Sequence, residues 1–147
     1  MRSVYTKLLV AVVSIGSLLV VLESNAQEGE LTMSESHRVA DAYYAAFQGG
    51  DVEQVPMAED LKFTSPRYVL GSAEAFKGAL RGLFAQVNSL SISSQMIDDD
   101  TVLTFYDLDL GAPGGPIPMA ERLQITDGKL ISVDLLFDSA LLPQPAN

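Results

Sequence analysis

The sequence predicts an α+β fold in which helices pack on one face of a curved antiparallel sheet. Apolar residues recur every three or four positions in two segments before residue 88, and from residue 89 onward they alternate with polar residues at a period of two. The helical segments also precede a run of strands, an order that is typical of α+β folds rather than of alternating α/β folds. With 147 residues, the chain has room for one domain of ordinary size.

The first half of the domain is expected to be mainly helical. One helix begins after Ser34, whose hydroxyl can cap it, and Gly49-Gly50 ends it. Asp51 can cap a short helix that follows. A second long helix is expected over Ser72–Val87, because its apolar side chains recur at three and four residues.

Strands are expected around and after the second long helix. A short strand covers residues 61–64, and Pro66 closes it. Further along the chain, Leu90, Ile92 and Met96 are expected to share one face of a strand whose other face is polar. The remaining expected segments are the turn 98–100, the strand 101–110, the loop 111–116, the strand 119–126, the hairpin turn Asp127-Gly128 and the strand 130–137.

Residues 1–26 have the pattern of a secretory signal peptide. Arg2 and Lys7 make a positive start, Leu8–Leu22 is an apolar stretch of 15 residues, and Ser24-Asn25-Ala26 offers small residues for cleavage. Fifteen residues are short for a membrane span, which needs roughly 20. We therefore expect cleavage near Ala26 and export to a bacterial periplasm or beyond, with an uncleaved anchor as the alternative.

The mature chain is expected to have three parts. Residues 27–33 are polar and form a flexible lead-in, residues 34–140 form the folded domain, and residues 141–147 form a C-terminal tail. No long linker, repeat or low-complexity block divides the domain.

The composition excludes several kinds of site and partner. The chain has no cysteine and one histidine, which excludes disulfides, thiolate metal sites and sites that need two imidazoles. Its formal net charge of −10 argues against nucleic acid and anionic membrane surfaces, because both require a basic footprint. No metal and no cofactor are expected. His37 falls in the first turn of the first helix, where we expect it to be exposed rather than a ligand.

Four short motifs resemble, in their order and spacing, the SnoaL-like and ketosteroid-isomerase-like branch of the nuclear transport factor 2-like superfamily. They are Tyr43–Asp51, Phe63–Pro66, Gly71–Phe76 and Glu121–Leu130, and the resemblance covers about residues 34–140. It implies a cone made of a bent sheet and helices, an apolar pocket inside the cone, and usually a homodimer. The superfamily includes isomerases, cyclases, dehydratases, epoxide hydrolases and non-catalytic domains, so the fold does not choose a function.

Glu121 is the leading candidate for site chemistry. In its expected strand it shares a face with Met119 and Leu123, so the period-two geometry places its carboxyl among apolar neighbours. Such burial disfavours the ionised form and raises the pKa of a carboxyl, which suits a general acid or a neutral hydrogen-bond donor. The alternative is a glutamate near a strand end that reaches solvent or pairs with Arg122 or Arg67.

The resemblance assigns roles to two more positions. It matches Glu121 to the hydrogen-bond-donating aspartate of ketosteroid isomerase and Tyr43 to the tyrosine that donates to the substrate oxyanion. Tyr43 also lies on the apolar stripe of its helix, so a core tyrosine is the alternative, and the adjacent Tyr44 is expected to face outward. Ser65 stands where the isomerase has its proton-shuttling aspartate. Serine cannot shuttle a proton at neutral pH without a base beside it, so ketosteroid isomerisation is not expected.

Asp107 and Asp109 alternate with leucines on the strand 101–110. One of them, Asp107 first, could enter the mouth of the pocket and pair with Glu121 as a carboxylate dyad. In the alternative, which we prefer, the leucines are buried and both aspartates face solvent. Asp134 is expected to face away from the pocket.

Two function classes remain open from the sequence. The first is a pocket that binds a small apolar or mixed-polarity molecule, with enzymatic activity left open and Glu121 and Tyr43 as the groups for any weak acid–base catalysis. The second is a non-catalytic dimerisation module whose cone is filled by its own side chains, and the apolar Leu136 on the outer face suits a dimer in either case. The residues expected to line the pocket are Phe63, Ser65, Phe105, Met119, Leu123, Val133 and Phe137.

Overall fold

The structure, a computed structural model, describes residues 33–142. The predicted signal peptide, all of the lead-in except Met33, and residues 143–147 of the predicted tail lie outside the described residues. Among the residues that are described, no helix is long and apolar enough to span a membrane.

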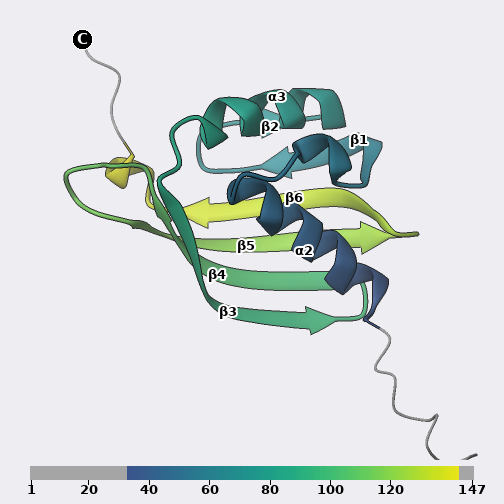
Figure 1. The fold of residues 1–147 in the computed structure, drawn as a ribbon. Helices are drawn as coiled ribbons and strands as arrows, with labels where there is room; N and C mark the ends of the chain where they lie inside the picture. Colours follow the sequence, from purple (N-terminus) through teal and green to yellow (C-terminus); the bar gives the residue numbers. More distant parts are fainter. Residues whose placement is uncertain (1–32, 143–147) are drawn as a thin grey trace, which may run out of the picture. The chain divides into compact units, whose positions relative to one another are not determined.

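Residues 33–142 form two α-helices and two short 3-10 helices, and Figure 1 shows the α-helices. Helix α2 covers Glu35–Phe47 and helix α3 covers Ala73–Phe84, while the 3-10 helices η1 and η2 cover Val52–Gln54 and Ser139–Leu141. The predicted caps Ser34 and Asp51 are confirmed, because each side chain accepts a hydrogen bond from a backbone N–H of the helix that it precedes. Ser72, predicted as the first residue of the second helix, caps α3 in the same way.

Helix α3 ends three residues before the predicted end at Val87. After Phe84 the backbone tightens, with Gln86 N donating to the carbonyl of Leu83 at 2.8 Å and Val87 N donating to that of Phe84 at 3.4 Å. This tight turn leads directly into the next strand, so the apolar spacing continues past the last helical residue although the helix does not.

Six strands form one sheet in the order β2-β1-β6-β5-β4-β3. Neighbouring strands are antiparallel, except that β1 and β6 are parallel. The predicted α+β class is therefore confirmed, with one parallel pair in the otherwise antiparallel sheet. The strands are β1 Met57–Thr64, β2 Val69–Leu70, β3 Ser89–Asp98, β4 Thr101–Asp109, β5 Ile117–Thr126 and β6 Lys129–Phe137.

The first strand is longer than predicted, and strand β2 was not predicted. Glu59 and Asp60 were expected before the strand but lie within β1, where both are exposed. The sequence signal fails here because β1 carries buried side chains only at Leu61 and Phe63. Strand β2 has two residues, and the turn after Thr64 brings them back against β1.

Strand β3 contains a β-bulge that changes which residues face the helices. Its pairing with β4 shifts between Ile92 and Ser94, so Ser93 is an extra residue without a partner of its own. As a result Gln95 pairs opposite the buried Thr104, while Met96 turns to the outer face and is exposed. Leu90, Ile92 and Met96 were predicted to share one face of this strand, and that prediction is wrong for Met96.

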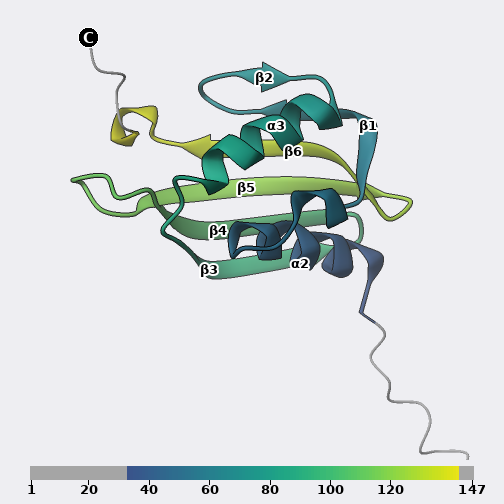
Figure 2. The same ribbon diagram turned by 45° about the horizontal axis from the view of Figure 1, so that its top comes forward.

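Both α-helices cover the same face of the bent sheet, as the two views in Figures 1 and 2 agree. Helix α2 packs on β3, β4 and β5, and α3 packs on β1. Aromatic rings connect these layers, with the Phe63 and Phe76 ring centroids 4.8 Å apart and those of Phe47 and Phe84 4.7 Å apart. The core therefore sits between the helices and the inner face of the sheet.

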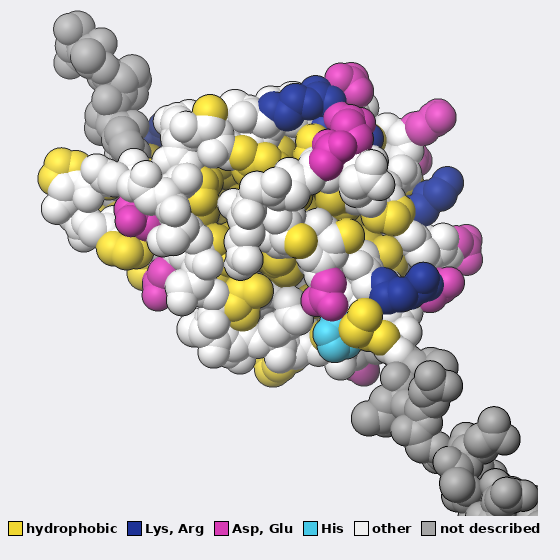
Figure 3. All heavy atoms as spheres, in the orientation of Figure 1, with side chains coloured by type: hydrophobic (Ala, Val, Ile, Leu, Met, Phe, Trp, Pro, Cys, Tyr) yellow, Lys and Arg dark blue, Asp and Glu magenta, His cyan; other side chains and the backbone are white. Residues whose placement is uncertain are grey.

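An ion-pair cluster fastens η1 to α3. Glu53 accepts hydrogen bonds from Lys77, at 2.9 Å, and from Arg81. Positive and negative side chains accordingly gather over α3 in Figure 3. These groups are at the surface, so we assign the cluster a role in fixing the position of η1 rather than a role in chemistry.

Candidate functional site

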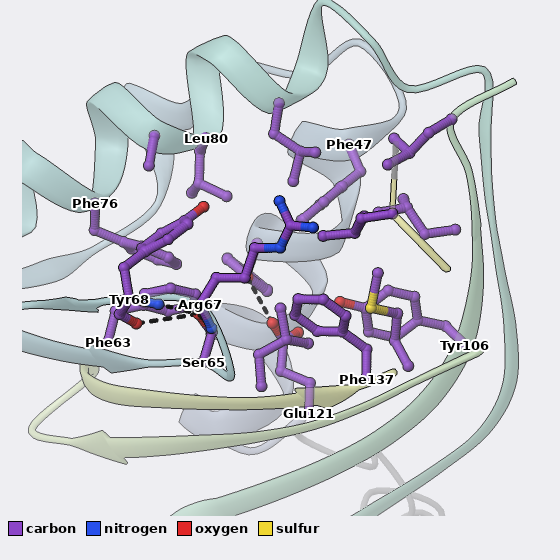
Figure 4. Close-up of a pocket in the computed structure, with 18 residues that line it drawn as sticks. Phe47, Phe63, Ser65, Arg67, Tyr68, Phe76, Leu80, Tyr106, Glu121 and Phe137 are labelled. Atoms are coloured by element: carbon purple, nitrogen blue, oxygen red, sulfur yellow. Dashed lines mark hydrogen bonds between the residues drawn. The ribbon is translucent and has the colours of Figure 1, made fainter. Parts of the chain in front are cut away.

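A cavity of about 90 Å³ lies between the helices and the inner face of the sheet (Figure 4). Most of its walls are aromatic or aliphatic side chains from α2, α3, β1, β4, β5 and β6. The polar lining consists of a few residues at its base and at its mouth. The full lining is Tyr43, Phe47, Phe63, Ser65, Arg67, Tyr68, Phe76, Ala79, Leu80, Leu83, Tyr106, Leu108, Leu110, Met119, Glu121, Leu135, Phe137 and Leu142.

Several residues expected to line the pocket lie in this cavity, and three do not. Phe63, Ser65, Met119 and Phe137 are in the lining, together with Glu121 and Tyr43. Three others lie elsewhere, in the core or on the outer face: Leu123, Val133 and Phe105.

The three residues lie outside the cavity for different physical reasons. Leu123 and Val133 are fully buried partners on adjacent strands, where they pack as core. Phe105 alternates with the buried Thr104 and Tyr106 along β4, so its ring points to the outer face and is 41% exposed. The alternating set with Tyr106 and Leu108 takes the inside, which agrees with the preferred alternative for Asp107, so the prediction of Phe105 as a pocket residue is wrong.

Glu121 lies at the base of the cavity and is held by tyrosines from helix α2. The Tyr43 hydroxyl donates to its Oε1 at 2.9 Å, and the Tyr44 hydroxyl donates to its Oε2 at 2.8 Å. A third phenol, that of Tyr106 on β4, is close enough to the same carboxyl to lower its pKa. The side chain is only 2% exposed, so the alternative of a glutamate reaching solvent is not what the structure shows.

Tyr44 was expected to face outward, and that prediction is wrong. Adjacent residues on a helix point about 100° apart, so one narrow apolar stripe would leave Tyr44 in solvent. Helix α2 instead buries a wide face against the curved sheet, and Tyr44 is 4% exposed. A signal was present in the sequence: Ala40, Tyr44 and Phe47 recur at four and three residues and form a second row beside Tyr43.

Burial sets the protonation of Glu121. Desolvation raises the pKa of its carboxyl from 4.5 to about 7, and the hydrogen bonds from Tyr44, Tyr43 and Tyr106 lower it but do not outweigh the burial. Burial, followed by the nearby Glu121 charge, raises the pKa of each of these tyrosines above its ordinary value. The tyrosines therefore remain neutral donors, while the carboxyl changes its protonation near neutral pH and can donate or accept a proton.

A polar chain behind Tyr44 supports this arrangement. The Gln95 amide donates to the Thr104 hydroxyl at 3.1 Å, and Thr104 in turn lies close enough to the Tyr44 hydroxyl to lower its pKa. Thr104 is completely buried. Neither Gln95 nor Thr104 was predicted from the sequence. The β3 bulge turns Gln95 inward, whereas Thr104 alternates with Tyr106 and Leu108 along β4, a signal that was present in the sequence.

The mouth of the cavity is formed partly by the turn between β1 and β2. The Ser65 hydroxyl donates to the Tyr68 carbonyl at 3.0 Å and accepts from the backbone N–H groups of Arg67 and Tyr68. These bonds hold the turn, so Ser65 is a structural residue of the rim. Arg67 reaches across the mouth, and its Nη2 donates to the Ser139 carbonyl at 3.2 Å.

The remaining candidates lie away from the cavity. Asp107 is exposed on the outer face of β4, because its neighbours Tyr106 and Leu108 take the inner face. It therefore does not form a dyad with Glu121, and the preferred solvent-facing alternative holds for it. Asp134 faces outward and accepts from Arg122 at 2.7 Å.

His37 was expected to be exposed, and the structure confirms this. The His37 side chain is 44% exposed, and its Nε2 lies 3.7 Å from a carboxylate oxygen of Asp41, one turn further along α2. Within residues 33–142, no three histidine, aspartate or glutamate side chains come together as a group that could hold a metal ion.

Comparison with known proteins gives similarity at the level of structure alone. No family model and no curated protein match the sequence. A crystal structure of a protein from Kribbella flavida superposes with a TM-score of 0.65 at 24% identity, over 71% of this chain and 87% of that one.

Two further solved structures superpose on most of this chain. An NTF2-like protein of unknown function from Cytophaga hutchinsonii superposes with a TM-score of 0.62 at 12% identity, over 76% of this chain and 96% of that one. An LEH-like epoxide hydrolase from M. tuberculosis superposes with a TM-score of 0.58 at 20% identity, over 72% of this chain and 84% of that one. The chain therefore has the nuclear transport factor 2-like fold, the fold that its resemblance to the SnoaL-like and ketosteroid-isomerase-like branch predicted.

Proposed function

We propose that the cavity binds a small, largely apolar molecule and that Glu121 hydrogen-bonds a polar group on it. One observation carries the proposal: a buried carboxyl with a pKa of about 7 lines an otherwise mostly apolar cavity. If Glu121 only packed in the core, protein atoms would surround its carboxyl on every side. Glu121 instead has three tyrosines on the protein side and the cavity beside it.

The size of the cavity limits the ligand. About 90 Å³ is three times the roughly 30 Å³ that a water molecule occupies in the liquid, which favours a ligand pocket over a cone filled by its own side chains. The volume is below the roughly 300–1,000 Å³ of pockets that enclose drug-sized ligands. The proposed ligand is therefore small, of about the size of one substituted ring, or extends out through the mouth.

Any chemistry would use a single carboxyl. Glu121 is the only aspartate or glutamate in the lining, and the Ser65 hydroxyl is engaged in the rim turn. A group with a pKa near 7 can accept a proton from a bound molecule and return it at another position. The hydrogen of Tyr43 is donated to Glu121, so Tyr43 acts on a ligand through that carboxyl rather than as a direct donor.

Native mass spectrometry of the protein purified from cells tests the binding. We expect a small molecule that dissociates on denaturation and whose occupancy falls in Glu121→Gln but not in Asp107→Asn, a control that removes an exposed carboxylate from the outer face. Occupancy unaffected by Glu121→Gln would contradict the role of Glu121. If no molecule is bound, and none binds from a set of single-ring compounds, the self-filled interaction module is favoured instead. Turnover that survives both Glu121→Gln and Tyr43→Phe would overturn the acid–base assignment.

We propose in addition that two copies associate through the outer face of the sheet. Leu136 is 67% exposed there, and it lies with Phe105, Leu103 and Ala120 along a hollow of about 690 Å³. An exposed apolar face of this kind is typical of association surfaces. The Arg122–Asp134 ion pair lies in the same hollow and has both signs of charge, so a two-fold axis can place Arg122 opposite the partner's Asp134.

Light scattering after size exclusion tests the association. Leu136→Lys is expected to shift a dimer to monomer, because it places a charge within the apolar face. Val69→Lys is the matched control, since Val69 is 70% exposed on β2 and lies outside that hollow. A wild-type monomer at all concentrations, or a dimer that both variants retain, would contradict the proposal.

We propose export on the sequence pattern of residues 1–26 alone. Expression in a Gram-negative host is expected to give a periplasmic protein whose mass corresponds to a chain that begins at Gln27. A product in the membrane fraction that retains residues 1–26 would contradict cleavage and support the uncleaved anchor.

A further inference from the structure

Among the described residues that line the cavity, Arg67 is the only lysine or arginine. It lies in the turn between β1 and β2, and Figure 4 shows its guanidinium among the side chains around the cavity. The Ser65 hydroxyl accepts from the Arg67 backbone N–H at 3.3 Å, which holds the start of the side chain. Its Nη2 donates to the Ser139 carbonyl, which holds the far end. The guanidinium is thus positioned at the mouth from both sides.

The charge of Arg67 has no carboxylate partner in the part of the chain that the structure describes. Residues 33–142 contain four arginines, and the other three each pair with an acidic side chain. Arg38 pairs with Glu35, Arg81 with Glu53, and Arg122 with Asp134. In a chain with 19 acidic and 9 basic residues, carboxylates are plentiful, yet within residues 33–142 the Arg67 side chain is bonded only to a backbone carbonyl.

The donor capacity of this side chain is mostly unused. A guanidinium has five N–H donors in a planar fork and no acceptor, and it matches a carboxylate through two parallel hydrogen bonds. One donor is taken by Ser139. The remaining donors can serve an anion but offer little to a purely apolar molecule. The net charge of −10 repels anions from the protein as a whole, so selection of an anion needs a local cation such as this one.

We propose that the ligand is a small carboxylate with an apolar or aromatic body, and that Arg67 binds its carboxylate at the mouth of the cavity. This inference rests on the proposed function and names the ligand class for the same site. The body would lie among the aromatic walls, which include Phe63, Phe76 and Phe137. Its far end would then meet Glu121 at the base. The two ends of the cavity thus present opposite chemistry: a donor-only cation at the mouth and a protonatable carboxyl at the base.

Calorimetric titration with two matched probes tests this class. Phenylacetate and phenylacetamide have nearly the same shape and differ in charge. The wild-type protein is expected to bind phenylacetate about fivefold more tightly in low salt, a ratio typical of an accessible ion pair. In Arg67→Gln the ratio should fall to about one while the affinity for phenylacetamide is unchanged, and Arg67→Lys should retain part of the preference.

The control is Lys62→Gln, which removes an exposed cation from β1 that does not line the cavity. It should leave the ratio at its wild-type value. Equal binding of the two probes by the wild-type protein, or a preference that Arg67→Gln retains, would overturn the assignment to carboxylates and leave the pocket proposal standing. Binding of neither probe to any variant at millimolar concentration would overturn the inference together with the pocket proposal.

Discussion

At the scale of the residue, Glu121 links stability to pH. Its pKa is about 7 in the folded protein and 4.5 in the ordinary reference state, so the folded protein binds the extra proton between these values. Stability from this proton is fully present below about pH 4.5 and is lost as the pH rises through about 7. The loss is about 3 kcal/mol, because each pKa unit corresponds to about 1.4 kcal/mol.

Comparison of the wild-type protein with Glu121→Gln isolates this effect. Thermal or urea unfolding at several pH values should show the difference in unfolding free energy changing in favour of the glutamine variant between pH 5 and pH 8. Glutamine has the same shape and does not ionise, so the remaining carboxylates cancel in the comparison. Parallel stability curves for the two proteins across this range would show that Glu121 does not titrate near neutral pH.

Tyr44 should tune the pKa of Glu121. Its hydroxyl donates to Oε2 at 2.8 Å, and this bond favours the ionised carboxylate. In Tyr44→Phe the pKa of Glu121 should therefore rise above about 7, which carboxyl ¹³C NMR titration can measure. Tyr68→Phe is a suitable control, because Tyr68 is 52% exposed at the rim and its hydroxyl takes no part in the bonds to Glu121. An unchanged or lower Glu121 pKa in Tyr44→Phe would contradict the role of this donor.

Single residues show how far sequence patterns predict the site. Strict alternation along β5 places Glu121 inward, since every second residue of that strand is buried. The partners of Glu121 are harder to predict, because they depend on how widely a helix is covered by the sheet beneath it. Tyr44 is buried since α2 packs on three strands of a curved surface, and that curvature is a property of the assembled sheet.

At the scale of the element, the end of α2 depends on its two glycines. Gly49 has a φ of +92°, and the Gly50 N–H donates to the Ala45 carbonyl at 3.1 Å. A Cβ at residue 50 would lie 2.8 Å from that carbonyl oxygen, so Gly50→Ala must displace backbone next to the tyrosines. We expect a loss of unfolding free energy of about 1–3 kcal/mol, measured by urea denaturation.

A glycine in helix α3 serves as the control, because its substitution by alanine should have the opposite effect on stability. Gly78 is helical and exposed, and a Cβ there meets nothing within 4 Å. Gly78→Ala should therefore stabilise the protein by about 0.5–1 kcal/mol, because alanine has less backbone freedom to lose on folding. Equal effects of the two substitutions would show that the Ala45 contact does not limit residue 50.

The bulge in β3 shows why the faces of this strand could not be predicted from its sequence alone. Leu90 and Ile92 alternate with serines, but Ser94 interrupts the apolar face before Met96, and the side chains alone do not identify Ser93 as the extra residue. The bulge is set by the match between β3 and the bent β4, a long-range requirement. One inserted residue then moves Met96 outward and brings Gln95 into the polar chain behind Tyr44.

At the scale of the whole molecule, the helices-then-strands order was sufficient for the fold class but not for the topology. The parallel pairing of β1 with β6 joins segments about 70 residues apart, and no local pattern encodes which strand becomes the neighbour of β1. Local sequence patterns cannot predict the volume of the cavity either, because it is the space that remains after the helices and the sheet have packed. The site could therefore be predicted as a buried carboxyl with an aromatic partner, while its size and its mouth could not.

The charge of the whole chain leads to a last prediction. A formal net charge of −10 at pH 7 and a pI of about 4.3 mean that the folded protein repels itself at neutral pH. Raising sodium chloride from 10 to 300 mM shortens the screening length from about 30 Å to below 10 Å, which weakens this long-range repulsion more than it weakens close pairs such as Arg122–Asp134.

We expect the Tm at pH 8 to rise with this salt change by about 2–5 °C, and to show no rise near pH 4.3, where the net charge is close to zero. Calorimetric or circular-dichroism melting curves at the two pH values measure the difference. A fall of the Tm with salt at pH 8 would mean that the surface ion pairs of Glu53 and Asp134 contribute more to stability than the excess acidic charge takes away.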